Sequence, residues 1–234
     1  MRQCLFIFLL LILVSCKNNL KKEDKVMGGI KNYTSVGYDQ IPRSLRYKGD
    51  FFTAWKWDDQ NGENILILST ESNYGGYDES RYLYGTHFAR QGSGYEMLWK
   101  MTDYEKDCYM DLTCNFLSGS TTVTDLDGDG FAEVKLQYEL GCRDARTSAS
   151  MKLLLYENGK KRALRGLRWI SPYENLGKKY PYKLTEMCKD NTPSRDYNGG
   201  QYESEKDFQD APPVFLDFAR EEWMKYVEEK SSRY

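Results

Sequence analysis

The chain has 234 residues, of which 33 are basic and 35 are acidic, so its net charge at pH 7 is only −2. Proteins that bind the phosphate backbone of nucleic acids normally carry a basic excess, so this balance argues against a nucleic-acid partner. About 190 residues follow a polar N-terminal segment, enough for one domain with a real core, and no internal repeat divides them.

The first 15 residues are expected to be a secretory signal peptide. Arg2 precedes an unbroken apolar run over residues 5–14, which is too short to span a bilayer as a helix. The run ends in Leu13-Val14-Ser15-Cys16, which has the pattern of a bacterial lipobox, where the signal is cut before a cysteine that receives lipid. We therefore expect lipidation at Cys16 and membrane attachment through acyl chains such as palmitate.

Residues 16–44 are expected to form the lipidated N-terminus and a flexible tether. They are polar, rich in lysine up to Lys31 and poor in large apolar side chains. Lys17 directly after Cys16 fits the rule that sorts enterobacterial lipoproteins to the outer membrane. The expected location is therefore the cell envelope, at the outer membrane, and the sequence leaves open which face of that membrane the protein occupies.

Three β-hairpins are predicted in the part of the chain that follows. Each consists of two strand-like segments around a short turn that contains glycine. The first turn carries Asn61-Gly62, a pair that is strongly favoured in two-residue hairpin turns. The predicted strand pairs cover residues 51–57 and 64–69, 81–90 and 95–102, and 151–156 and 161–170.

A further strand is predicted between the second and third hairpins. Apolar residues from Ala132 to Leu140 alternate with polar residues from Glu133 to Glu139, which is typical of a strand with one solvent-exposed face. Seven or eight strands joined by tight turns predict a mostly β fold, with a single antiparallel meander. The turns alone do not choose between a sandwich, a barrel and a bent sheet.

The chain is expected to end in a helix over about residues 211–229. Asp210 can cap this helix, and its first turn tolerates Pro212 and Pro213. Residues 45–230 are therefore expected to form one β-rich domain with the C-terminal helix packed on it. The residues that recur at helical spacing and should face the sheet are Leu216, Ala219, Trp223, Tyr226 and Val227.

The segment TTVTDLDGDGFAEVKLQYELGC, residues 121–142, concentrates acidic side chains just before the predicted strand. Its alternating aspartates, a glycine for a sharp turn and a closing glutamate are typical of a calcium site built from hard oxygen ligands. An EF-hand is excluded because its twelfth position, here Leu136, requires glutamate. A charged turn without an ion is the alternative. The expected calcium ligands are Asp125, Asp127, Asp129, the Phe131 carbonyl and Glu133.

Two resemblances bear on these residues. The spacing D-x-D-x-D-G-x-x-E between two strands resembles the calcium loops of FG-GAP repeats in integrin-type propellers, but the single copy does not favour a propeller. Most of residues 50–225 resemble a family of Bacteroidota-type lipoproteins labelled with surface polysaccharide biosynthesis, which implies a role at the cell surface without implying a mechanism. The strings that carry this resemblance are GENILILS, RYLYGTHF, LWKMTDYEKDC, VTDLDGDGFAEVKLQYELGCRD, MKLLLYENGKKRALRG and DFQDAPPVFLDFAREEW.

Four cysteines remain beyond the lipobox, and an oxidising envelope predicts that they form disulfides. Their spacing leaves three pairings open. The family resemblance implies a bridge from Cys108 to Cys142, which leaves Cys114 for Cys188. A zinc site is not indicated, because the sequence has no CxxC motif and His87 is its only histidine.

Candidate contact residues for a ligand are tyrosines on glycine-rich loops, whose flat amphipathic rings suit glycans and proteins alike. They are Tyr74, Tyr77, Tyr197 and Tyr202, and the preference of β-sheets for tyrosine is the simpler alternative. A serine or cysteine hydrolase is not indicated, because His87 lies in a strand-like apolar segment.

The expected function is that of a lipid-anchored, non-enzymatic envelope protein with a structural calcium loop, which binds or helps assemble surface polysaccharide. A glycan-cleaving or glycan-modifying enzyme is one alternative, since two carboxylates suffice for that chemistry. An accessory subunit that binds another envelope protein is the other.

Overall fold

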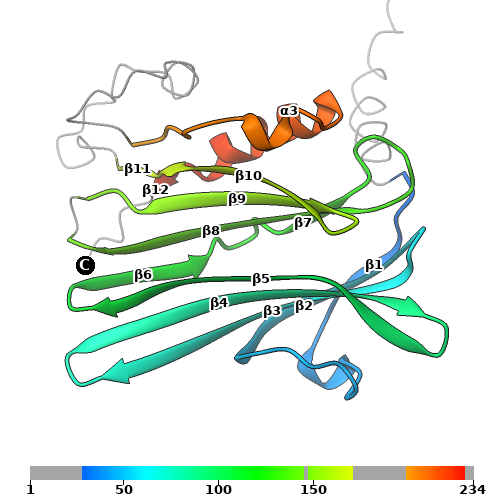
Figure 1. Ribbon diagram of the computed structural model, residues 1–234, viewed down its shortest axis with the longest axis horizontal. Coiled ribbons are helices and arrows are strands. Elements are labelled where there is room, and N and C mark those ends of the chain that lie inside the picture. The colour runs from blue at the N-terminus through cyan, green and yellow to red at the C-terminus, as the bar shows by residue number, and fades with distance from the viewer. Residues whose placement is uncertain (1–27, 145–146, 171–198, 230–234) are drawn as a thin grey trace, which may run out of the picture.

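The structure, a computed structural model, describes residues 28–144, 147–170 and 199–229. Two antiparallel sheets lie one above the other, and a helix, α3 (Pro213–Tyr226), covers the outer face of the second (Figure 1). The first, sheet A, has the spatial order β1 (Lys31–Val36), β2 (Asp50–Asp59), β3 (Gly62–Gly75), β4 (Asp78–Gln91) and β5 (Gly94–Cys108).

Sheet B has the order β10 (Lys160–Leu167), β9 (Ser150–Glu157), β8 (Glu133–Arg143) and β6 (Asp111–Phe116), and the short β7 (Thr122–Thr124) also pairs with β8. Two 3-10 helices, η1 (Tyr38–Gln40) and η3 (Lys206–Phe208), and a parallel pair, β11 (Trp169–Ile170) and β12 (Glu228–Glu229), complete the described elements. The described residues form an open sandwich and not a closed barrel, so the predicted mostly β, antiparallel class is confirmed.

All three predicted hairpins are present, as β2–β3, β4–β5 and β9–β10. In the third turn Asn158 and Gly159 have φ angles of 46° and 78°, as a type I′ turn requires of both central residues. β3 and β4 extend beyond the predicted strands and meet at a further tight turn, Gly76-Tyr77. Strong turn residues therefore set the register of both sheets.

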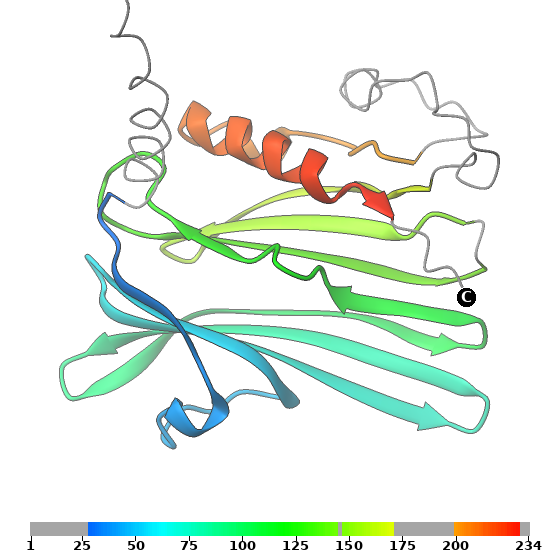
Figure 2. The ribbon, with the colours of Figure 1, turned by 180° about the vertical axis from the view of Figure 1, so that it is seen from behind.

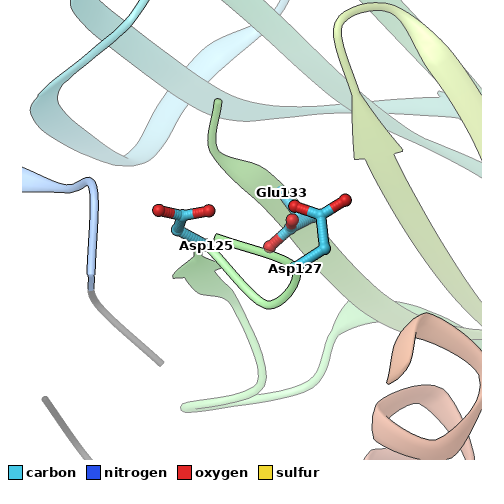
Figure 3. A group of neighbouring side chains, drawn as sticks. All are labelled: Asp125, Asp127 and Glu133. Carbon is cyan, nitrogen blue, oxygen red and sulfur yellow. The ribbon is translucent and has the colours of Figure 1, made fainter. Parts of the chain in front are cut away.

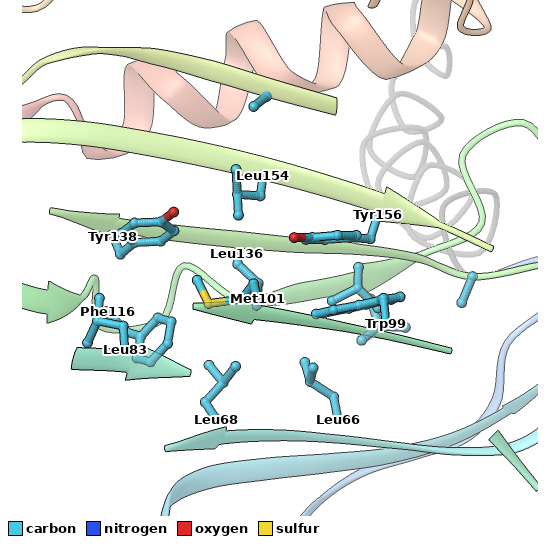
Figure 4. Packing of buried hydrophobic residues seen from close by; sticks show 14 of the residues in the cluster. Leu66, Leu68, Leu83, Trp99, Met101, Phe116, Leu136, Tyr138, Leu154 and Tyr156 are labelled. Atoms are coloured by element: carbon cyan, nitrogen blue, oxygen red, sulfur yellow. The ribbon is translucent and has the colours of Figure 1, made fainter. Parts of the chain in front are cut away.

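The main hydrophobic core lies between the two sheets (Figure 4). The rings of Trp99 on β5 and Tyr156 on β9 stack across it, with their centroids 3.9 Å apart. Burial of each large apolar side chain contributes about 1.5–3 kcal/mol to folding. The other labelled members come from both sheets: Leu66, Leu68, Leu83 and Met101 from sheet A, and Phe116, Leu136, Tyr138 and Leu154 from sheet B.

A second core lies between α3 and the outer face of sheet B (Figure 2), as predicted for the C-terminal helix. The helix begins at Pro213 with Pro212 as its N-cap, so the expected cap at Asp210 is wrong: Asp210 pairs with Lys160 instead. The predicted stripe is only partly the buried one, because Phe215 is fully buried while Leu216 and Tyr226 lie at the border of this core.

The polar side of β8 was expected to face solvent, and this expectation is wrong. Glu133, Lys135 and Gln137 are fully buried, because α3 covers that face of sheet B. Lys135 forms an ion pair with Glu222 of the helix, and Glu222 also pairs with Lys225 one turn further on. Alternation of polar and apolar residues predicted the strand correctly but not the partner that covers its polar face.

The N-terminal part of the chain is also more structured than expected. From residue 28 onward the predicted tether is part of the domain: β1 pairs with β2 at the edge of sheet A. Ile41 and Leu45 then pack on the outer face of that sheet, against Ile65, Ile67 and Phe88. Among the described residues, no helix combines the length and apolar character that a membrane-spanning helix needs.

Candidate metal centre

The acidic loop, residues 125–133, connects β7 to β8 at one end of sheet B (Figure 3). Its turns are held by aspartate side chains that accept hydrogen bonds from backbone amides: Gly130 N donates to Asp125 Oδ1 (3.3 Å), and Phe131 N donates to Asp129 Oδ1 (2.8 Å). Gly128 and Gly130 take φ angles of 76° and 86°, which glycine adopts most readily. The sequence therefore folds here into a compact loop lined with carboxylates.

The carboxylates form two groups in which one oxygen of each residue lies within 4.8 Å of the others. The first group is Asp125, Asp127 and Glu133, and the second is Asp127, Asp129 and Glu157. The structure thus places three of the four acidic residues expected from the sequence in the first group, and the fourth, Asp129, only in the second. It adds Glu157, which the loop motif does not contain, because Glu157 on β9 is the direct cross-strand partner of Glu133 on β8.

Glu133 is the most deeply buried member of the cluster, with no exposed surface. Its Oε2 accepts hydrogen bonds from the Thr124 hydroxyl (2.8 Å) and from Leu126 N (2.9 Å). Its Oε1 is buried and has no hydrogen-bond partner. Burial, together with the charges of Asp127 and Glu157, raises the pKa of Glu133 to about 8, although the hydrogen bonds from Leu126 and Thr124 act in the opposite direction. An unpartnered buried carboxylate oxygen is costly, and a bound cation would satisfy it.

No lysine or arginine forms an ion pair with this cluster: among the ion pairs of residues 28–144, 147–170 and 199–229, none involves any of its five carboxylates. Glu157 is half-buried and its Oε1 also lacks a partner. Burial raises the pKa of Glu157, as do the charges of Asp127 and Asp129. The five carboxylates, which we call the acidic cluster (Asp125, Asp127, Asp129, Glu133 and Glu157), can therefore hold a metal ion.

Two other segments hold the acidic loop in place. Gln60, in the β2–β3 turn, donates from its backbone to Gly130 O (2.9 Å) and from its side chain to Asp129 O (2.8 Å). Gly29, near the start of the described chain, donates from its backbone N to Asp125 Oδ2 at 2.6 Å. A side chain at residue 29 would clash, because a Cβ there would lie 2.5 Å from that oxygen and 2.8 Å from Gly130 Cα. The loop therefore joins both sheets and the N-terminal segment.

The carboxylate geometry also resembles an acid–base pair, with Glu133 as an acid of raised pKa beside the Asp127 carboxylate. However, Glu133 has no exposed surface, so a glycan substrate cannot touch it. The arrangement favours metal binding over glycoside hydrolysis at this place.

Phe131 N contributes to the turn, and the ligand role expected for its carbonyl stays a prediction.

The predicted bridge from Cys108 to Cys142 is present, with the two Cα atoms 5.3 Å apart. It joins the end of β5 in sheet A to the end of β8 in sheet B and closes a loop that contains the acidic loop. Within the described residues Cys114 carries a free, buried thiol in the core between the sheets, where its Sγ donates to Arg81 O, so the predicted bridge to Cys188 stays a prediction. Cys188 lies outside the described residues.

The remaining predicted residues are dispersed. Tyr74 and Tyr77 are exposed at the β3–β4 turn of sheet A. Tyr202 instead packs edge-to-face on Trp223 beneath the helix and donates its hydroxyl to Glu205, so its expected contact role is not supported. His87 is buried between Trp57 and Trp99, and burial lowers its pKa to about 3, so it is a neutral core residue. Cys16 and Tyr197 lie outside the described residues.

An open pocket of about 510 Å³ lies on the outer face of sheet A, where sequence reasoning did not expect a site. Burial alone would raise the pKa of Glu63 at its edge, but hydrogen bonds from Lys56, Tyr95 and Arg90 outweigh this and lower it to about 2. Its size is within the range of small-ligand pockets, and all of its lining residues except Val36 have polar or charged side chains. The lining residues are Asn32, Thr34, Val36, Gln40, Lys56, Asp58 and Glu63.

Comparisons of the chain with protein-family models, with curated proteins and with solved structures found no match. The fold and the site by themselves define the chain as a two-sheet β-sandwich protein with an acidic loop that could hold a metal ion.

Proposed function

We propose that this chain is a lipid-anchored, non-enzymatic envelope protein whose sandwich is stabilised by calcium in the acidic cluster, and that it binds or helps assemble surface polysaccharide. The observation that carries the metal part is Glu133: its fully buried Oε1 has no partner and lies in a group of carboxylates. Calcium fits best, because it takes six to eight oxygen ligands, including carboxylates and backbone carbonyls, in flexible geometry. Asp125, Asp127 and Glu133, which form one group, would hold it, and Asp129 and the Phe131 carbonyl are the further ligands that the sequence predicts.

A structural rather than catalytic role for the ion follows from the surroundings of the loop. Hydrogen bonds from Gln60 and Gly29 tie it to sheet A and to the N-terminal segment, and the Cys108–Cys142 bridge closes the same part of the chain. An ion that binds carboxylates of β8 and of the loop would hold these connections together. The polysaccharide part is supported by the sequence resemblance, by Tyr74 and Tyr77 at an exposed turn and by the polar pocket on sheet A.

Calcium is expected to raise the Tm of the purified protein, and Asp127→Ala with Asp129→Ala is expected to abolish this response. An ion that binds only the folded state stabilises it by about 2.7 kcal/mol at 100 times its Kd. For a domain of this size this corresponds to a Tm rise of roughly 5–10 °C. The measurement is thermal unfolding by circular dichroism in calcium and in chelator.

Asp217→Ala, which removes an exposed carboxylate from α3, serves as the matched control and should keep the full calcium response. Equal Tm values of the wild type in calcium and in chelator would show that the acidic cluster binds no calcium and is a charged turn.

Binding of the full-length protein to a glycan array, without release of sugar, is the expected result for the polysaccharide role. Polar side chains of the pocket would pair with sugar hydroxyls, and the Tyr74 and Tyr77 rings would stack on sugar faces. Asp58→Asn in the pocket and Tyr77→Ala on the turn then locate the contact. Released sugar would instead favour an enzyme, and no binding to any glycan would favour a protein partner.

A further inference from the structure

We propose that a cluster of tyrosines and lysines on the outer face of sheet A binds the surface polysaccharide and selects a polymer that carries negative charges. This inference rests on the polysaccharide role proposed above, and it names a contact surface and a class of glycan. The members of this group, which we call the tyrosine–lysine cluster, are Lys48, Tyr82, Tyr84, Tyr104 and Lys106.

The alternation of side chains along β4 places the cluster on the outer face of sheet A. Leu83 belongs to the core between the two sheets, so its neighbours Tyr82 and Tyr84 point to the other side. Tyr104 on β5 is the direct cross-strand partner of Tyr82, so its side chain lies on the same face. The centroid of the Tyr82 ring lies 6.2 Å from that of Tyr84 and 5.7 Å from that of Tyr104. The three rings therefore form one continuous aromatic surface.

Part of this aromatic surface is open to a ligand. Tyr104 is 48% exposed and Tyr82 is half-buried. Tyr84 is buried and donates its hydroxyl to Glu71 Oε2 (2.9 Å), so it supports the surface from below. A tyrosine ring offers an apolar face together with a polar hydroxyl, which is the combination that a sugar ring presents in return.

The two lysines add positive charge to this surface. The Lys48 ammonium lies 4.9 Å from the centroid of the Tyr84 ring, and the Lys106 ammonium lies 4.4 Å from that of Tyr104. Both also lie near the Tyr82 ring, at 5.3 and 5.6 Å from its centroid, so the two nitrogen atoms are at most about 11 Å apart, the sum of these distances. Attraction between the cations and the rings holds both ammonium groups beside the aromatic surface.

Acidic side chains cancel only part of this charge. Glu71, the cross-strand partner of Tyr82 on β3, lies 3.4 Å from the Lys48 ammonium. Lys106 is exposed and forms no ion pair with any other residue in the described part of the chain. A carboxylate, sulfate or phosphate group on a sugar would supply the missing countercharge. Charge complementarity therefore favours an anionic glycan over a neutral one.

The extent of the outer face favours a polymer over a single sugar. Glu63 at the edge of the polar pocket and Glu71 beside the tyrosine–lysine cluster are eight residues apart on β3 and lie on the same face of the sheet. At 3.3 Å per residue this separation is about 26 Å. A polysaccharide chain can contact both places at once, whereas one sugar cannot.

Affinity electrophoresis of the full-length protein tests this inference, with gels that contain either polygalacturonate, which carries a carboxylate on each sugar, or neutral dextran. We expect polygalacturonate to retard the wild type and dextran to leave its mobility unchanged. Lys106→Gln removes the ammonium group without a countercharge and should weaken binding about tenfold, the lower end of what a hydrogen bond to a charged group contributes. Tyr104→Ala, which removes the most exposed ring of the cluster, should cause a comparable loss.

Two further variants serve as matched controls. Lys161→Gln removes an exposed lysine of β10 in sheet B that also forms no ion pair within the described residues, and it should bind like the wild type. Tyr104→Phe keeps the ring and should retain most of the binding. Because the net charge of the chain is −2, general attraction to an anionic polymer does not explain retardation of the wild type.

Equal retardation by the two polymers would overturn the preference for an anionic glycan. Binding that Lys106→Gln and Tyr104→Ala leave unchanged, or that Lys161→Gln weakens as much as they do, would overturn the tyrosine–lysine cluster as the contact surface. A wild type that binds glycans on the array but is not retarded by polygalacturonate would overturn this inference alone. A wild type that binds no glycan in either experiment would overturn the polysaccharide role itself.

Discussion

Glu222→Gln is expected to lower the free energy of unfolding by about 3–5 kcal/mol, because it breaks a buried ion pair and leaves one charge uncompensated. Glu222 and Lys135 are both almost fully buried between α3 and sheet B. Burial alone would raise the pKa of Glu222, but hydrogen bonds from Lys135 and Lys225 outweigh it and hold the carboxyl group ionised. Without this carboxylate, the Lys135 ammonium has no countercharge. Urea unfolding of both proteins gives the difference.

Substitution of the other member of the pair, Lys135→Met, should lower the free energy of unfolding by less. The difference between the two losses is a sharper test than either loss alone. In Lys135→Met, Glu222 keeps Lys225, whose side chain is largely exposed and already bonded to it. The double variant Lys135→Met with Glu222→Leu should recover most of the lost stability, since replacement of a whole buried pair by apolar residues is often neutral. Equal losses in the two single variants, or a double variant as unstable as Glu222→Gln, would contradict this explanation.

Removal of the Cys108–Cys142 bridge, by alanine at both positions, is expected to lower the free energy of unfolding by about 4 kcal/mol. The two cysteines are separated by 34 residues, and closure of a loop of that length removes this much entropy from the unfolded chain in the chain-entropy model. The bridge also joins sheet A to sheet B at one end of the sandwich. Urea unfolding under oxidising conditions measures the loss.

Cys114→Ala is the matched control, since it removes a buried thiol of the same core without breaking a bridge. Its cost should be limited to about 1 kcal/mol for the lost side-chain volume. A wild type that loses no stability on addition of reductant, or a control as unstable as the double variant, would show that the bridge contributes little.

The fold was predictable where short-range chemistry determines it. Gly62 in the first hairpin and Asn158-Gly159 in the third fix their turns locally, because these residues adopt positive φ, which few residue types do readily. The choice of a sandwich over a barrel was not predictable, because it depends on how distant strands close around Trp99 and Tyr156. The buried polar face of β8 was missed for the same reason: Glu222, which neutralises Lys135, lies 87 residues away.

The acidic loop was predictable because its acidic residues, Asp125 to Glu133, lie within nine residues of one another. Glu157 was not, since only the register of β8 against β9 brings it to Glu133. The Cys108–Cys142 bridge followed from a resemblance rather than from spacing, and the free thiol of Cys114 shows that counting cysteines alone does not assign partners. β1 was missed because its residues are largely exposed and polar, so it lacks the alternation that marks a strand.

The contact between Gly29 and Asp125 has a mechanical consequence. Tension transmitted along the chain from its N-terminal side enters the described domain at this point, before it reaches β1. The first groups to bear the load are the Gly29 amide, held by the Asp125 carboxylate, and the Ile30 side chain, buried in the core between the sheets. A pulling force would therefore act first on the contact with Asp125 of the acidic loop and on the core between the sheets. It would reach β1, the edge strand of sheet A, only after these contacts.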